Sequence, residues 1–272
     1  MFEEFYGMKH TLFGRDVPAT ALYESQAMGN ALGRLFYAAD RQLFVVVTGD
    51  AGSGKTTLVR KFSESLPKEE YILLYLSDSK LTPRWFYKGL LDQLGIESKF
   101  YRGDAKRQLQ KEIEIIRGVH HKKVVCVLDE AHLLEKETIE EFRFLLNYRF
   151  DSMSPMALIL VGQTELWDEK LRLKRYAAVR QRIDINCVLS RLDRSETEKY
   201  IQSHLRYAGC EQEIFTNRAI DEIFRISAGT PRVINRVCEK ALMYTFQRQR
   251  RLIDNEDIRY VSEHEMLEGG ED

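Results

Sequence analysis

The sequence predicts an α/β protein in which a doubly wound parallel sheet of five strands is followed by a small all-helical lid domain. Two observations predict this fold class. Five apolar runs alternate with segments of helical periodicity as far as residue 190, which is typical of a parallel sheet covered by helices on both faces. Beyond residue 190 the apolar runs stop and only helical patterns remain.

The expected strands are short apolar runs bounded by glycine or polar residues. Four of them are nearly continuous, at 43–49, 71–77, 123–130 and 156–162, as expected of strands buried on both faces. The fifth, at 182–189, alternates more between apolar and polar residues and is expected nearer an edge of the sheet. Segments whose apolar residues have helical spacing alternate with these strands, beginning before the first of them, at 21–40, 56–66, 82–95, 104–119 and 136–150.

Four regions follow from this pattern. Residues 1–20 form an aromatic leader that we expect to pack on the α/β core, which itself covers 21–190. Residues 191–262 form the helical lid, whose first helix is predicted to begin with a capping box between Ser195 and Glu198. The last segment, 263–272, holds five acidic residues and no Lys or Arg, and is expected to be disordered.

The composition excludes several classes of protein. The net charge of −1 gives no overall basic signal for nucleic acid, although the acidic tail hides a positive balance in the remainder. The four cysteines form no C-x-x-C pair, and reduced, buried thiols are expected. Neither a signal peptide nor a membrane-spanning apolar run is present, so the chain is expected to be cytoplasmic and without a membrane partner.

A phosphate-binding loop follows the first expected strand. The stretch GDAGSGKTT fits G-x-x-x-x-G-K-[ST] between a strand and a helix, the context that this motif requires. Its glycines let backbone N–H groups surround a phosphate, Lys55 is expected to reach the β- and γ-phosphates, and Thr56 is expected to bind Mg²⁺. The predicted ATP-binding residues are Gly49, Asp50, Ala51, Gly52, Ser53, Gly54, Lys55, Thr56 and Thr57.

A pair of carboxylates ends the third expected strand. Asp129 is expected to hold Mg²⁺, mainly through water, and Glu130 to orient or deprotonate the attacking water. The four letters DEAH also occur in DEAH-box helicases, but those need two tandem domains and this chain has room for one. A transporter ATPase is disfavoured because no LSGGQ-like stretch precedes the acidic strand. His132 is interpreted as a residue at a helix start.

Polar and basic residues elsewhere complete the predicted site. Gln163 follows the fourth strand, where a side chain at the strand tip can sense the γ-phosphate. Arg232, in the first turn of a helix that begins with Pro231, opposes the helix dipole and so favours an anionic ligand. Arg182, ahead of Arg180, is the candidate arginine finger for a neighbouring subunit, which implies a homo-oligomeric ring or filament. A solvated helix face or contact with DNA phosphates is the alternative.

The motifs together resemble those of AAA+ ATPases. GDAGSGKT, VVCVLDEAH, LVGQTEL, VRQRI and GTPR occur in the order found in that class. The leader FEEFYGMKHTLFGRDVPATALYES and the later stretches ETEKYIQSHLRYAG and GTPRVINRVCEKAL are similar to the ExeA-type group, the general secretion pathway protein A-like proteins, with relatives among TnsC-, IstB- and Mu B-like transposition ATPases. The resemblance implies that Lys55, Thr56, Asp129 and Glu130 carry ATP hydrolysis, with Gln163 as sensor 1 and Arg232 as sensor 2. Gln163 departs from the Asn, Ser or Thr usual at sensor 1.

The resemblance leaves two functions. Secretion members of the group carry a membrane span and a cell-wall-binding domain after this core. This sequence shows neither, so the expected function is that of a transposition regulator, which binds double-stranded DNA with ATP and recruits a transposase. The alternative is a secretion-type ATPase that remodels a protein or envelope partner without DNA. Basic side chains around two helix starts are the possible DNA contacts: Lys80, Arg84, Lys99, Arg102, Lys106 and Arg107. Trp85 and Phe86 are interpreted as core residues rather than platforms for bases.

Overall fold

The computed structural model describes residues 2–14, 17–77, 81–146 and 154–266. Contacts between residues divide the chain into two compact units. The α/β unit holds residues 27–51 and 55–189, and the helical unit holds residues 1–26 and 190–272, with which the loop residues 52–54 are grouped. Each unit has its own buried apolar residues, in two clusters in the α/β unit and in one cluster in the helical unit.

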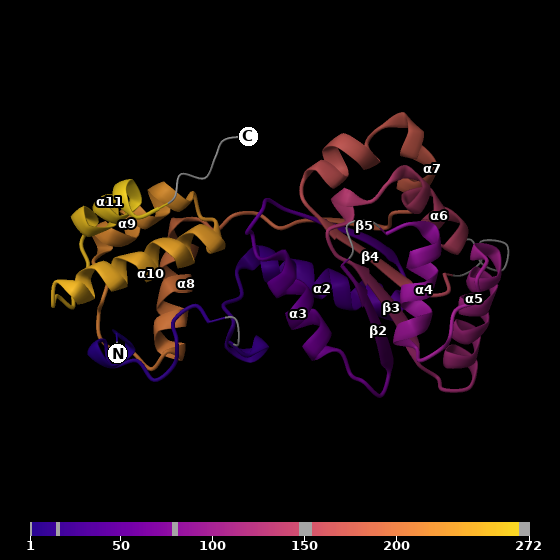
Figure 1. The fold of residues 1–272 in the computed structure, drawn as a ribbon, viewed down its shortest axis with the longest axis horizontal. Coiled ribbons are helices and arrows are strands. Elements are labelled where there is room, and N and C mark those ends of the chain that lie inside the picture. Colours follow the sequence, from indigo (N-terminus) through magenta and orange to yellow (C-terminus); the bar gives the residue numbers. More distant parts are fainter. Residues whose placement is uncertain (1, 15–16, 78–80, 147–153, 267–272) are drawn as a thin grey trace. The chain divides into compact units, whose positions relative to one another are not determined.

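A parallel sheet of five strands forms the centre of the α/β unit (Figure 1). Its spatial order is β2-β3-β4-β1-β5, and each neighbouring pair is parallel. β5, the strand with the alternating sequence, lies at an edge as expected. The strand bounds are β1 (Phe44–Thr48), β2 (Tyr71–Leu76), β3 (Lys123–Leu128), β4 (Ala157–Gly162) and β5 (Ile185–Val188).

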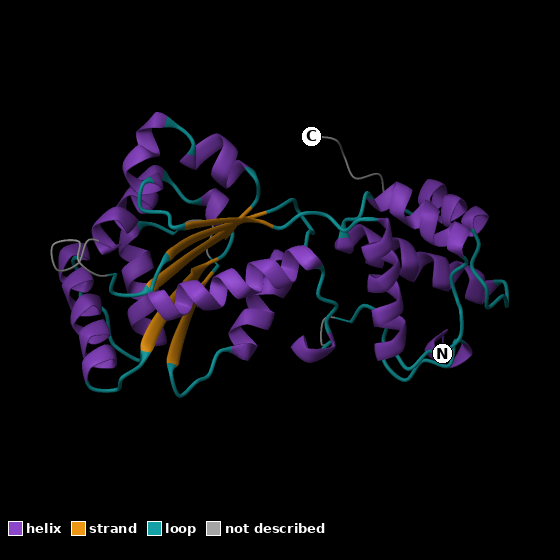
Figure 2. Ribbon diagram, turned by 180° about the vertical axis from the view of Figure 1, so that it is seen from behind, coloured by secondary structure: helices purple, strands orange, loops and turns teal. Residues whose placement is uncertain are grey.

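Helices cover both faces of the sheet (Figure 2). One face is covered by α2 (Gln26–Arg41) and α3 (Lys55–Ser65). The other face packs against α4 (Pro83–Gln93), α5 (Arg102–Gly118) and α6 (Lys136–Leu146). Shorter elements complete the unit: η2 (Ala131–Leu133), the π-helix η3 (Leu166–Leu171), η4 (Lys174–Tyr176) and α7 (Ala177–Arg180).

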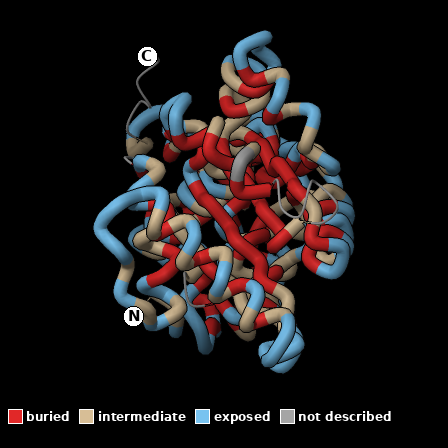
Figure 3. Tube along the Cα trace, turned by 90° about the vertical axis from the view of Figure 1, so that its right-hand side faces the viewer, coloured by how far each residue is buried: buried red, intermediate tan, exposed pale blue. Residues whose placement is uncertain are grey.

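Burial explains why the central strands read as continuous apolar runs. Successive side chains of a strand point to opposite faces, so Val46 packs in the cluster with α4 to α6 while Val45 and Val47 pack in the cluster with α2 and α3. Every residue of β1 and of β4 is buried, and Figure 3 shows buried segments, in red, enclosed by intermediate and exposed ones. A sheet buried on both faces therefore confirms the predicted doubly wound class.

The helical unit is built from four longer helices, α8 (Arg194–Tyr207), α9 (Asn217–Ser227), α10 (Pro231–Gln247) and α11 (Asn255–His264). A capping box does start α8, but it joins Asp193 to Glu196 and not Ser195 to Glu198, because the helix begins two residues earlier than its sequence pattern suggested. α11 reaches His264, so the acidic tail predicted from residue 263 overlaps its end, and residues 267–272 lie outside the described part.

The aromatic leader packs on the helical unit, which corrects the expectation that it packs on the α/β core. Its short helix α1 (Phe2–Phe5) and the residues that follow join the apolar core of α8 to α11, and η1 (Ala19–Ala21) comes next along the chain. The Tyr6 hydroxyl donates to the carbonyl oxygen of Leu242 at 3.1 Å and lies 2.7 Å from the Thr245 hydroxyl. Cys210 Sγ donates to the Tyr6 carbonyl at 3.4 Å. The sequence shows that these aromatic residues must be buried, but not against which surface.

The structure also bears on the cysteines and on membrane-spanning helices. All four cysteines are free and buried, as predicted, and burial raises the pKa of the Cys126 and Cys238 thiols. Across the described residues, no helix combines the length and the apolar character that crossing a membrane requires.

Candidate active site

The strand order brings three predicted segments to one edge of the sheet. β4 lies between β1 and β3, so Gln163, directly after β4, falls between the loop that follows β1 and the carboxylates that follow β3. All of these strands are parallel, so their carboxyl ends meet at the same edge, where ligands of open α/β sheets bind. The sequence placed the residues correctly on strand ends, but their adjacency depends on the strand order.

The loop after β1 has the backbone of a phosphate cradle. Gly52 and Gly54 have φ of +79° and +97°, a region that side chains with a Cβ rarely adopt. Lys55 is buried as the first residue of α3, and its Nζ donates to the carbonyl oxygens of Gly49 and Asp50 at 2.8 Å each. The Lys55 ammonium group therefore lies against the backbone of the loop, at the position where the sequence predicts the phosphates.

Two further side chains of the loop fit a triphosphate with Mg²⁺. The Ser53 hydroxyl is buried and has no hydrogen-bond partner among the described residues, a costly arrangement that an anionic oxygen would relieve. Thr56 is exposed at the start of α3, where its hydroxyl can reach a cation. Hydroxyl and carboxylate oxygens are the ligands that Mg²⁺ prefers, so the donors present suit the predicted cofactors.

Asp129 is fixed by hydrogen bonds from both sides. It is 6% exposed, and its Oδ2 accepts from the Tyr75 hydroxyl at 3.0 Å while Oδ1 accepts from the Glu130 N–H at 2.9 Å. Burial and the neighbouring Asp129 charge raise the pKa of Tyr75 to about 12, so the phenol remains a donor at physiological pH. Tyr75 therefore orients the carboxylate predicted to hold Mg²⁺.

Glu130 takes an unusual backbone conformation next to Asp129. Its φ of 53° is left-handed, which costs a non-glycine residue about 1–3 kcal/mol and is concentrated at functional sites. The side chain remains about half exposed, so solvent water reaches its carboxylate. The turn thereby separates the two carboxylates: Asp129 is buried and Glu130 reaches solvent.

His132 connects Glu130 to Gln163. Its side chain is only 10% exposed, and Nδ1 lies 3.5 Å from Glu130 Oε2. Nε2 of His132 lies 3.0 Å from the side-chain amide nitrogen of Gln163. The backbone N–H of Gln163 points to Nδ1 of His132 at 3.4 Å. Lys170 Nζ donates to the carbonyl oxygens of His132 and Leu134, which fixes the turn that carries the ring. The interpretation of His132 as a mere helix-start residue missed this bridge.

The predicted arginines lie on different elements. Arg180 ends α7 and donates to the carbonyl oxygens of Leu171 and Arg172 at 3.0 and 2.6 Å, so its guanidinium is bound within its own chain. Arg182 follows in the turn before β5 and is partly exposed. Arg232 is the second residue of α10 in the helical unit, with Pro231 before it as expected.

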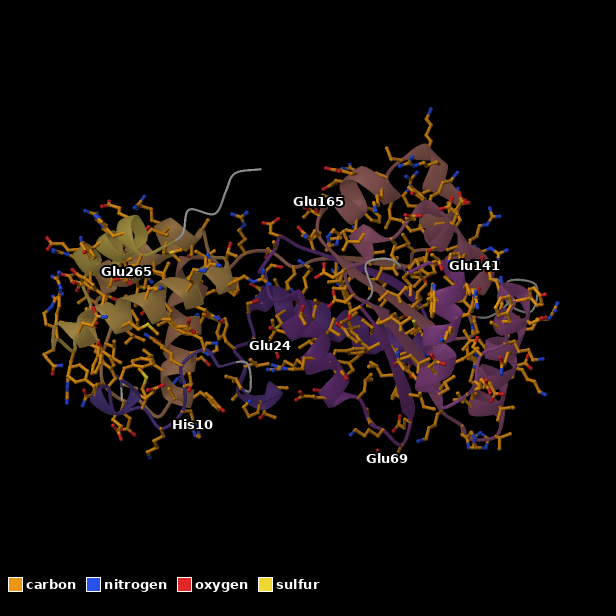
Figure 4. The ribbon with its side chains drawn as sticks, viewed as in Figure 1. His10, Glu24, Glu69, Glu141, Glu165 and Glu265 are labelled. Atoms are coloured by element: carbon orange, nitrogen blue, oxygen red, sulfur yellow. The ribbon has the colours of Figure 1, made fainter. Side chains whose placement is uncertain are left out.

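The predicted DNA contacts fall into two groups. Lys80 lies outside the described residues. Lys106 and Arg102 lie near the buried Glu141 carboxylate, at 3.1 and 3.5 Å, and Tyr87 donates to it at 2.6 Å; Glu141 is labelled in Figure 4.

Arg84, Lys99 and Arg107 are all exposed, although Arg107 pairs with Asp104. Lys106 is thus bound mainly to its own domain, whereas Arg84 and Lys99 face solvent. The interpretation of Trp85 and Phe86 as core residues is half wrong. Phe86 is fully buried, but Trp85 is 51% exposed.

Comparisons with known proteins agree with this geometry. Residues 38–169 match the family described as AAA domain. The chain is 32% identical over 265 residues to General secretion pathway protein A of Aeromonas hydrophila, covering 95% of this chain and 47% of that protein. The chain therefore spans about half the length of this curated relative.

Solved structures show the same fold at low sequence identity. The structure of Drosophila ORC bound to DNA superposes with a TM-score of 0.69 at 16% identity, over 98% of this chain and 65% of that one. Cdc6p from Pyrobaculum aerophilum gives a TM-score of 0.69 at 17% identity, over 93% and 72%. The Holliday junction branch migration motor RuvB of Thermotoga maritima gives 0.54 at 18% identity, over 88% and 69%.

Proposed function

We propose, from the premise that the chain is a P-loop AAA+ ATPase that uses ATP and Mg²⁺, that it is an oligomeric switch whose nucleotide state controls binding to DNA. The likeness to General secretion pathway protein A supports the ExeA-like branch of these ATPases. The fold and the cofactor follow from the α/β unit, whereas the task to which hydrolysis is applied is the proposal.

The chemistry is divided among residues at the carboxyl edge of the sheet. Lys55 and the loop N–H groups would bind the phosphates, and Thr56 with Asp129 would hold Mg²⁺, which when bound would supply a Lewis acid for phosphoryl transfer. Glu130 orients the attacking water from its exposed position, and Gln163 senses the γ-phosphate. His132 lies between these two side chains and positions both.

A neighbouring subunit completes the site. Arg182, ahead of Arg180, is proposed as the finger that enters the next subunit's site. Arg232 is proposed to read the γ-phosphate from the helical unit. Hydrolysis then depends on assembly, because an arginine finger stabilises transition-state charge only where two subunits meet.

One observation carries the proposal of DNA binding: Arg84 and Lys88 of α4 and Lys99, shortly before α5, form a group of cations without carboxylate partners among the described residues. In the described part of the chain, no carboxylate lies within salt-bridge distance of Arg84, Lys88 or Lys99. Unpaired cations on one surface favour a polyanion. The fold is also that of ORC, which has been solved bound to DNA.

The finer proposal is that the DNA-bound oligomer selects a target for a transposase. In this account ATP loads the protein on double-stranded DNA, the oligomer recruits the transposase, and hydrolysis releases the complex. In this account the surface cations would contact phosphates, which position a protein on DNA without reading the base sequence.

A secretion-type role is the second candidate, and the 32% identity to General secretion pathway protein A favours it. On this account the same ATPase cycle remodels a protein or envelope partner, and DNA has no effect on it. The two candidates share the ATP chemistry and differ only in the partner.

Duplex affinity in defined nucleotide states tests the proposal. Fluorescence anisotropy of a labelled random duplex is measured at fixed moderate salt with ATP, a slowly hydrolysed analogue, ADP and no nucleotide. The proposal expects tight binding with the triphosphates only, and affinity that falls as salt rises. Equal, weak signals in all four states contradict it and favour the protein or envelope partner. Lys55→Ala is the matched control, because it removes nucleotide binding and leaves the surface cations in place.

A further inference from the structure

Three aromatic rings are exposed on the same surface as the unpaired cations. Trp85 in the first turn of α4 is 51% exposed, and Phe100 and Tyr101, directly before α5, are 68% and 71% exposed. We call these three residues the aromatic patch. Phe86 and Tyr87, the next residues of α4, are fully buried and supply its core contacts, so the patch is not needed to anchor the helix.

Cations lie over the faces of these rings. The Arg84 guanidinium is 4.2 Å from the centroid of Phe100 and 6.0 Å from that of Trp85, and Lys88 Nζ is 4.8 Å from Trp85. Phe100 meets Tyr101 edge to face with centroids 5.4 Å apart. Arg84 therefore links two segments distant in sequence into one continuous aromatic and cationic surface.

The charges of this surface decide between classes of partner. Two of the acidic side chains nearby are already engaged: Asp104 pairs with Arg107, and Glu141 accepts from Lys106. A purely apolar partner would bury Arg84 and Lys88 without compensation, at a large desolvation cost. A partner that offers flat aromatic faces together with negative charge satisfies both the rings and the cations.

We propose that the aromatic patch stacks on unpaired DNA bases while the adjacent cations hold the phosphates, so that the protein binds single-stranded or locally opened DNA more tightly than intact duplex. This inference rests on the proposed function. Bases in a duplex present only their edges, whereas unpaired bases present π-faces that stack on aromatic side chains. Arg84 and Lys88 add cation–π contacts and neutralise the backbone.

Trp85 reports stacking directly. The chain has two tryptophans, and Trp167→Phe leaves Trp85 as the only one. Trp167 is partly buried against the core, so phenylalanine is a conservative replacement. In this background, Trp85 emission is titrated with oligothymidylate, with a duplex of equal length, and with phosphatidylglycerol vesicles, each with and without ATP.

The same ligands are then compared by affinity in aromatic variants of the full chain. Base–aromatic stacking contributes about 1–3 kcal/mol per base, so Phe100→Ala and Tyr101→Ala are each expected to weaken oligothymidylate binding by about 5- to 150-fold, with little change for duplex. Tyr37→Ala is the matched control: Tyr37 is 57% exposed on α2 and carries Arg41 at 6.0 Å from its ring, but lies outside the patch.

The outcomes separate this inference from the proposed function. Quenching of Trp85 by oligothymidylate, with affinity lost in the aromatic variants and kept in the Tyr37 variant, supports the inference. ATP-dependent duplex binding with no quenching and no aromatic dependence overturns the inference alone. Quenching without any ATP-dependent duplex binding supports the inference and contradicts the proposed function. Quenching by vesicles but not by oligothymidylate overturns the inference in favour of a membrane surface.

Discussion

Replacing His132 by alanine tests whether the bridge between Gln163 and Glu130 serves catalysis. The substitution removes the 3.0 Å contact between Nε2 and the Gln163 side-chain amide and the longer, 3.5 Å approach of Nδ1 to Glu130 Oε2. Lys55 and the loop that holds the phosphates are left in place. We therefore expect ATP turnover to fall while nucleotide affinity stays near that of the wild type.

The magnitude follows from the distances. The 3.5 Å separation of Nδ1 from Glu130 Oε2 exceeds the usual N–H···O range of about 2.7–3.2 Å, so it adds little as a hydrogen bond. The Gln163 contact is a single side-chain hydrogen bond at 3.0 Å, and one hydrogen bond typically contributes about 0.5–1.5 kcal/mol. Expressed fully in the transition state, that corresponds to a decrease in kcat of about 2- to 12-fold.

A double-mutant cycle distinguishes a bridge from two independent effects. Steady-state ATPase rates are measured for His132→Ala, Gln163→Ala and the double variant at saturating protein, with nucleotide affinity measured separately. Residues that act through one contact give a double variant no slower than the slower single variant. If the decrease in ATPase rate of the double variant equals the product of the two single decreases, the two residues act independently and the bridge is refuted. His120→Ala is the control that should leave the rate unchanged, because His120 is exposed and precedes β3, whereas the carboxylates follow the other end of that strand.

Three further predictions follow from single residues. Glu130→Gln should lower kcat by at least about 100-fold and retain nucleotide binding, because a positioned general base contributes about 10²–10⁴-fold; near-normal turnover contradicts the assignment. Gly229→Ala should lower Tm and cost more than about 2 kcal/mol, because its Cβ would lie 1.8 Å from the Leu192 carbonyl oxygen at φ +75°, whereas Gly95→Ala at the same φ meets nothing within 4 Å. An equal loss in both variants would assign the cost to φ alone. Burial lowers the pKa of His204 from 6.5 to about 4, so the unfolded chain gains the proton first on acidification. Stability present above pH 6.5 should fall by up to about 3 kcal/mol as the pH drops toward 4. Denaturant unfolding of His204→Phe should show a shallower acid slope, and an unchanged slope would exclude His204 as its source.

The α/β core was predictable because its signals are local. Five apolar runs and a loop motif identify strands, helices and the residues at strand ends, and the observed sheet agrees with that prediction. The edge position of β5 could be read from its polar alternation, but that of β2 could not: its run is continuously apolar, and only Leu74 of the strand is buried. These features depend on side-chain periodicity, which is written in the sequence of each element.

Features that depend on distant contacts escaped prediction. The leader is rich in aromatic residues, and its packing and hydrogen bonds with α10 show that it belongs to the helical unit. Trp85 and Phe86 are adjacent, and their opposite exposures follow from which side of α4 faces the sheet. The roles of Tyr75 and His132 appear only when neighbouring strand ends come together. Nothing in the local sequence around Tyr75 or His132 indicates that these side chains orient the residues of the site.

The most direct test of the account is the lifetime of the protein on DNA after the nucleotide supply is stopped. A labelled duplex is loaded with ATP, excess unlabelled duplex is added, and release is followed by anisotropy for the wild type and for Glu130→Gln. The account predicts release of the wild type at the rate of hydrolysis and prolonged retention of the variant, which binds ATP but does not turn it over. Equal release of both proteins, or no ATP-dependent loading of either, would contradict the claim that nucleotide state controls DNA binding.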